Sequence, residues 1–170
     1  MAASLASQQF VEITGIDKDF YTFYHVYNLH SLIYAAMFAG QFQTALGAVT
    51  RLEAAISEDL LRISSPPMAD SLEAFVAVRA HMLIRFRRWQ DIINLELPKD
   101  EKLYSVTTAT FHYAKGVAWA ATGHVNEAAR EQELLLASKK QVPPTGLDYP
   151  NKCVDVLAVA EAMLARELEY

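Results

Sequence analysis

The sequence is poor in the residues that would point to several common classes of protein. Its 170 residues include a single cysteine, Cys153, which excludes an internal disulfide and a zinc site built on several thiolates. It contains six glycines and six prolines, too few for a collagen-like or low-complexity chain. Acidic residues outnumber basic ones by 20 to 15, and the resulting net charge of -5 argues against a general nucleic-acid-binding surface.

We also expect no targeting or membrane segment. The first ten residues contain no Lys or Arg, unlike a secretory signal or an Arg-rich transit peptide. The most apolar early stretch, residues 29–39, contains His30 and is shorter than the roughly 20 apolar residues of a membrane span. We therefore expect a soluble, cytoplasmic protein that binds neither membranes nor nucleic acid.

What the sequence does contain is apolar residues at helical spacing. Hydrophobic residues make up 52% of the chain, which is enough for a packed core. We expect loops at the two proline-containing segments, 63–68 and 142–150, and we find no convincing strand. The pattern predicts an all-α fold. The expected helices cover residues 19–39, 42–57, 70–86, 89–95, 104–122, 126–140 and 151–169.

The predicted helices form pairs, and the pairs can be aligned on their turns at Gly40, Arg87 and Gly123. Three positions then agree in character: a bulky apolar residue two after the turn, a packing residue five after it, and a packing residue seven before it. In chain order these are Phe42, Trp89 and Val125; Ala45, Ile92 and Ala128; and Ile33, Ala80 and Gly116. Small residues at such positions let two helix axes approach closely.

This pattern resembles the tetratricopeptide repeat (TPR), a helix-turn-helix unit of ~34 residues that stacks into a superhelix. The second and third turns are separated by close to this period, and an inserted loop lengthens the first interval. The resemblance implies a right-handed α-α superhelix. In that arrangement residues 1–18 are an N-terminal extension, residues 19–140 form three hairpins, and residues 141–170 form a loop and a C-terminal capping helix.

Several stretches more closely resemble the middle part of longer bacterial and fungal TPR-domain proteins of unassigned activity. They are the run from Tyr27 to His30, PPMADSLEAF, HMLIRFRRW and VDVLAVAEAML. These relatives extend beyond both ends of the present sequence. The resemblance therefore implies a flanking domain of a longer chain as one possible partner.

The resemblance also implies which residues line the concave groove, because the first helix of each TPR hairpin faces it. The residues expected there are aromatic or apolar, with two histidines and one arginine. They are Tyr27, His30, Tyr34, Phe38, His81, Arg85 and Tyr113. The groove lacks the Lys/Arg/Asn set that clamps carboxylates in chaperone-binding repeats. We expect His30, Tyr34, His81 and Tyr113 to converge, either as a binding groove or as packed core.

No motif in the sequence carries recognisable chemistry, so the catalytic residues are unknown. There is no HExxH, no C-x-x-C, no histidine pair at i, i+4 and no nucleotide-binding loop. Cys153 opens the apolar stripe of the last helix and is most simply a buried hydrophobic residue. We expect no metal. The alternative is a divalent metal held by His30, His81 and His112 from three helices, with Asp70 or Glu73 adding a carboxylate.

Two functions follow. The first is a non-enzymatic scaffold that binds a protein or peptide partner, or self-associates, through the aromatic and histidine groove. The second is an enzyme or metal-binding domain that uses the same His/Tyr groove. A homodimer is one form of the first, because the helix at 20–38 has more aromatic residues than one hairpin can bury. These are Phe20, Tyr21, Phe23, Tyr24 and Tyr27.

Overall fold

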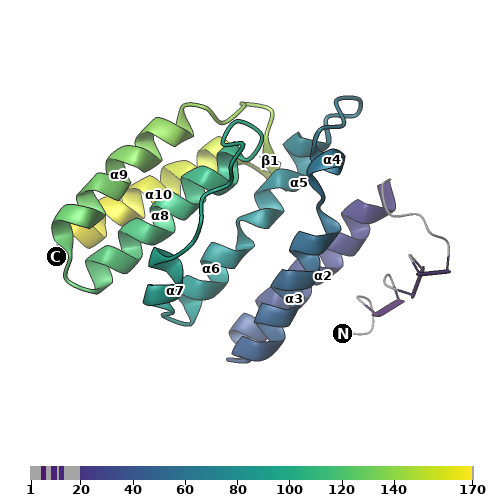
Figure 1. Cartoon of the computed structure of the whole chain (residues 1–170), viewed down its shortest axis with the longest axis horizontal. Coiled ribbons are helices and arrows are strands. Elements are labelled where there is room, and N and C mark those ends of the chain that lie inside the picture. The colour runs from purple at the N-terminus through teal and green to yellow at the C-terminus, as the bar shows by residue number, and fades with distance from the viewer. Residues whose placement is uncertain (1–4, 7–8, 11, 14–19, 170) are drawn as a thin grey trace.

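A computed structural model describes residues 5–6, 9–10, 12–13 and 20–169 of the chain. It is mostly helical, with one short two-stranded sheet, which confirms the all-α prediction (Figure 1). The helices are α2 (Phe20–Phe38), α3 (Phe42–Ala55), α4 (Glu58–Leu61), α5 (Met68–Val76), α6 (Val78–Arg85), α7 (Trp89–Ile93), α8 (Ser105–Ala121), α9 (Val125–Lys139) and α10 (Cys153–Leu168). Most of the predicted extension, residues 1–18, lies outside the described residues.

Three helical hairpins follow one another along the chain: α2 with α3, α5 and α6 with α7, and α8 with α9 (Figure 1). Helix α6 contacts α2 on one side and α8 on the other, so the middle hairpin lies between the other two. Helix α10 packs against both α8 and α9. No helix in the described part of the chain has the length and hydropathy that crossing a membrane requires.

The turns of the three hairpins have the same backbone geometry. Gly40, Arg87 and Gly123 all have positive φ, at 70°, 54° and 81°. At each turn this residue donates its N–H to the carbonyl three residues earlier, and the next residue donates to the carbonyl five residues earlier. This is the Schellman motif, which ends a helix with one left-handed residue. The second helix of each hairpin then begins two residues after the left-handed residue, at Phe42, Trp89 or Val125.

The packing positions predicted from the alignment are buried. Ala45, Ile92 and Ala128, each five residues after its turn, have no exposed surface. Ile33 and Ala80, each seven residues before its turn, are also fully buried. One continuous core joins the first two hairpins to one face of α8, and a second cluster lies between α8, α9 and α10.

Gly116 occupies a close contact between two helices, α8 and α10. A Cβ at this position would lie 2.6 Å from Cδ2 of Leu164 in α10. Leu164 is itself fully buried. The glycine therefore lets α10 pack closely on α8.

The helix predicted over residues 70–86 is interrupted at Ala77, which separates α5 from α6. In a continuous helix the N–H of Ala77 would donate to the carbonyl of Glu73. That carbonyl instead accepts the hydroxyl of Thr107 in α8, and Ala77 donates to Ala74. A side chain that enters the hydrogen-bond ladder in this way is a known cause of a helix break.

Three short elements, one helix and two strands, are not predicted by the sequence pattern. Helix α4 begins after Ser57, whose hydroxyl accepts the N–H of Leu60 at 3.3 Å and caps the helix. Strands β1 (Leu147–Asp148) and β2 (Asn151–Lys152) form an antiparallel hairpin in and just after the expected loop at 142–150. Two-residue strands are too short to show an alternating pattern, so the sequence gives no sign of them.

Candidate functional site

A pocket of about 610 Å³ lies between the hairpins and the last helix. One wall comes from the first helices of the three hairpins. Its residues are Tyr34, Met37, His81, Ile84, Arg85 and Tyr113. The opposite wall comes from α10 and the end of the β-hairpin. Its residues are Asn151, Asp155, Val156, Val159, Ala160 and Met163.

Four of the seven predicted groove residues meet in this pocket: Tyr34, His81, Arg85 and Tyr113. They come from α2, α6 and α8, as the alignment on the three turns required. The same alignment missed the second wall, because α10 was expected to be a capping helix.

The other three predicted residues do not line the pocket. The ring of His30 contacts Tyr34, with centroids 4.8 Å apart, and meets Phe75 edge-on at 5.0 Å. Tyr27 is half-exposed, and Phe38 is 81% exposed at the last position of α2. Because Phe38 follows Tyr34 by one helical turn, it lies on the same face, beyond the end of the pocket.

The two histidines of this region are held in their neutral form. Burial lowers the pKa of His81, and the carboxylate of Asp148 in β1 acts in the opposite direction. Burial also lowers the pKa of His30; Asp148 opposes this shift and His81 adds to it. At neutral pH both imidazoles therefore carry no charge, and His81 presents an uncharged ring to the pocket.

Tyr113 joins the two walls. Its hydroxyl lies 3.9 Å from Sδ of Met163 and donates a weak hydrogen bond to it. Burial raises the pKa of Tyr113, and also that of Tyr34, where Asp148 adds to the shift. Both phenols are thus protonated at neutral pH. The residues lining the pocket are mainly apolar or neutral, with charge confined to Arg85 and Asp155.

Arg85 and Asp155 are exposed charged side chains on opposite walls of the pocket. Neither forms an ion pair with any residue that the structure describes. The other arginines of the RFRRW segment are placed differently: Arg87 forms the turn, and Arg88 pairs with Asp91 at 2.6 Å and lies over the ring of Phe42.

The structure contradicts the grouping of His112 with His30 and His81. Nδ1 of His112 lies 2.7 Å from Oε2 of Glu131, so this histidine faces α9. His112 precedes the pocket residue Tyr113 by one position, which rotates it about 100° around the helix. Across the described residues, no three His, Cys, Asp or Glu side chains are placed to hold a metal ion.

Glu73, the carboxylate considered for such a metal site, has another role. Its two oxygens accept the backbone N–H groups of Val106 at 3.0 Å and Thr107 at 2.7 Å. These groups belong to the first turn of α8 and have no partner within that helix. By accepting these two N–H groups, Glu73 caps α8 from a neighbouring helix. The Glu73 side chain is buried.

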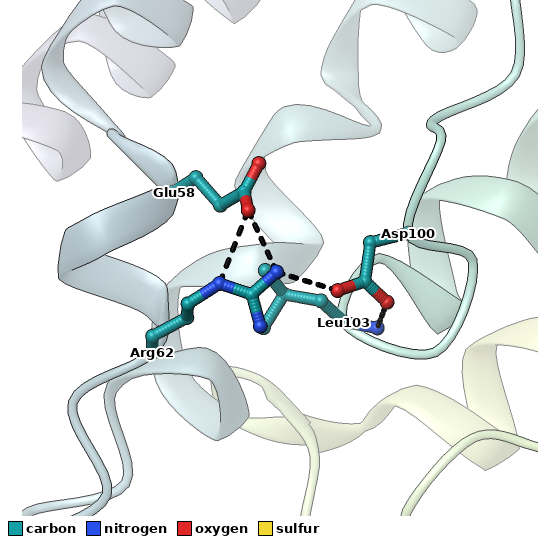
Figure 2. A network of polar contacts seen from close by, with 4 residues as sticks. All are labelled: Glu58, Arg62, Asp100 and Leu103. Carbon is teal, nitrogen blue, oxygen red and sulfur yellow. Dashed lines mark hydrogen bonds and ion pairs between the residues drawn. The ribbon is translucent and has the colours of Figure 1, made fainter.

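A separate polar network lies outside the pocket and ties α4 to the loop before α8 (Figure 2). Arg62 donates to Glu58 and to Asp100, each at 2.6 Å, and Asp100 also accepts the N–H of Leu103. Arg62 and the Leu103 N–H lower the pKa of Asp100. The side chains of Glu58 and Arg62 are exposed and that of Asp100 is partly exposed, so this network positions the loop and adds little stability.

Comparisons of the chain with protein-family models, with curated proteins and with solved structures gave no significant match. They assign the chain to no family. The relation to TPR proteins therefore remains a proposal that depends on the turns and packing positions described above.

Proposed function

We propose that this chain is a non-enzymatic scaffold that binds a protein partner through the pocket between its hairpins and α10. The observation that carries this proposal is that two apolar side chains which line the pocket are largely exposed to solvent. Val159 is 60% exposed and Met163 is 53% exposed. Exposed apolar surface beside a concavity is typical of sites that bind another molecule.

The proposal includes a TPR-like right-handed superhelix as the scaffold. Three observations support it: the hairpins end their first helices with the same left-handed turn, they bury the same positions, and their first helices share one wall of the pocket. In TPR-like solenoids the first helices line the concave binding surface.

The chemistry of the pocket favours an apolar segment of a protein. His81, Tyr34 and Tyr113 are uncharged at neutral pH and supply hydrogen-bonding groups beside Met37, Val156 and other apolar residues. The volume of about 610 Å³ is within the range of sites that enclose several side chains. Binding of this kind needs no cofactor and no catalytic residue.

A library of short random peptides, selected on the purified protein, tests the proposal. We expect the selected peptides to be rich in apolar residues and to bind with micromolar affinity. Met163→Lys should weaken their binding by ~10-fold or more, because a charge would have to be desolvated within the pocket.

Val125→Lys is the matched control, because Val125 is 55% exposed on α9 and does not line the pocket. Peptides that bind the wild type and Val125→Lys equally but bind Met163→Lys weakly would support the proposal. Failure to select any peptide, or equal binding to all three proteins, would contradict it.

A further inference from the structure

We infer that the partner of this pocket is a second copy of the same chain, bound about a two-fold axis with the two pockets facing each other. This inference rests on the proposed function and names its partner. Two independent features of the surface support it: the distribution of exposed apolar side chains and the distribution of unpaired charge.

The apolar surface extends beyond both walls of the pocket. On α2, Tyr34 lines the pocket and Phe38, one turn further, is 81% exposed. On α10, Val159 and Met163 line the pocket and also form part of a second shallow hollow on the outer side of that helix. A hollow with apolar residues projecting beside it is suited to a copy of itself, because each copy offers side chains to the other's hollow.

The charges of the pocket are also self-complementary. Arg85 and Asp155 stand on opposite walls, are exposed, and have no ion-pair partner among the described residues. Consider a two-fold axis that lies in the plane of the interface, midway between these two side chains and perpendicular to the line that joins them. It places Arg85 of each copy opposite Asp155 of the other and so creates two equivalent ion pairs. A second copy of the chain carries both the arginine and the aspartate that these two ion pairs need.

Charge reversal combined with sedimentation velocity over a concentration series tests this inference. The wild type should show a reversible equilibrium between 19.0 kDa and twice that mass. Arg85→Glu or Asp155→Arg alone should weaken the dimer by ~10-fold or more, because like charges then face each other. The double variant Arg85→Glu/Asp155→Arg should restore the wild-type affinity, since both ion pairs form again with reversed polarity.

Two further variants complete the experiment. Phe38→Ser should weaken the dimer, whereas Arg87→Glu, which changes a neighbouring exposed arginine outside the pocket, should leave it unchanged. All four affected positions are exposed, so each variant is expected to fold, and its circular dichroism spectrum should match that of the wild type.

Three results would overturn the inference: a wild type that remains at 19.0 kDa up to about 100 μM, a dimer insensitive to the single charge reversals, or a double variant that is not rescued. The selected peptides separate this failure from failure of the proposed function. A monomer that binds an apolar peptide at Met163 retains the scaffold function with another partner. A dimer whose affinity is unaffected by these peptides uses a different surface.

Discussion

Arg87 has the left-handed backbone conformation that Gly40 and Gly123 adopt at the two equivalent turns. A residue with a Cβ destabilises the folded state by roughly 1–2 kcal/mol in that conformation, because the Cβ lies too close to the backbone. Glycine has no Cβ and avoids this cost. The middle hairpin thus keeps the turn geometry of its neighbours despite an unfavourable residue.

Arg87→Gly should therefore stabilise the protein, by about 0.5–1 kcal/mol after the greater freedom of glycine in the unfolded chain is subtracted. Gly40→Ala is the converse test and should destabilise it by about 1 kcal/mol. A Cβ at Gly40 meets no atom within 4 Å, so this cost comes from backbone conformation alone. Urea unfolding measures both; a destabilising Arg87→Gly would contradict the account.

Glu73 stabilises the start of α8 as a buried acceptor, and its titration should be visible in the stability of the protein. Burial raises its pKa above the usual 4.5, although the side chain of Thr107 and the N–H groups of Thr107 and Val106 oppose the shift. The folded state therefore holds the proton more tightly than the unfolded state. The resulting stability is complete below pH 4.5 and is lost as the pH rises through the folded-state pKa.

Glu73→Gln keeps one oxygen acceptor and removes this titration. Its stability relative to the wild type should rise as the pH increases from 4 to 7. Glu73→Ala should cost about 1–3 kcal/mol at pH 4, because it leaves the N–H groups of Val106 and Thr107 buried without partners. The cost should be smaller at pH 7, because this variant also removes the titration of Glu73. Denaturant titrations at several pH values would reveal a constant difference for Glu73→Gln if the carboxyl group does not titrate in this way.

At the level of secondary-structure elements, the hairpins are joined by a small number of specific contacts. Arg79 of α6 donates two hydrogen bonds of 2.6 Å to the carboxylate of Glu53 in α3, which ties the middle hairpin to the first. Glu73 of α5 ties the middle hairpin to α8. The contact of Gly116 with Leu164 then fixes α10, and with it the second wall of the pocket.

Gly116→Leu should destabilise the protein by ~1–3 kcal/mol, because the new side chain occupies the space of Leu164 and moves α10 away from α8. Gly116→Ala should leave the free energy of unfolding almost unchanged. The gain in helix propensity of about 1 kcal/mol offsets the cost of displacing the Leu164 side chain. Thermal unfolding should also show that Leu164→Ala partly rescues Gly116→Leu. An unchanged melting temperature for Gly116→Leu would place that glycine outside the contact.

At the level of the whole molecule, the features that recur in each hairpin were predictable and those made by distant segments were not. The turns at Gly40 and Gly123 were visible because a left-handed residue favours glycine, and Arg87 was identified only through alignment with them. The break at Ala77 depends on the hydroxyl of Thr107, thirty positions further along the chain. No local pattern within residues 70–86 encodes it.

The candidate site divides in the same way. Tyr34, His81, Arg85 and Tyr113 could be predicted together because neighbouring repeats place equivalent positions side by side. The wall formed by α10 could not, because its placement depends on the irregular segment before it and on the close contact at Gly116. Exposure of Val159 and Met163, on a helix whose other side is buried, marks that wall in the structure.

His30 and His81 come from α2 and α6, and the carboxylate of Asp148 in β1 acts on both, so the titration of these two histidines reports on the arrangement of the whole molecule. Burial lowers the pKa of both histidines below the usual 6.5. Below pH 6.5 the unfolded chain therefore binds protons that the folded protein does not accept. The corresponding stability is complete above pH 6.5 and is lost as the pH falls through the folded-state pKa values.

We expect the urea midpoint of the wild type to fall between pH 7 and pH 5, and the midpoint of His30→Gln/His81→Gln to fall less over the same range. Glu73 acts in the opposite direction, because it contributes more stability as the pH falls towards 4.5. The comparison is therefore made between proteins that both retain Glu73. A variant with His124→Gln is the control, since His124 is exposed beyond the third turn. Parallel pH dependence of the wild type and the double variant would show that the two histidines are protonated equally in the folded and unfolded states.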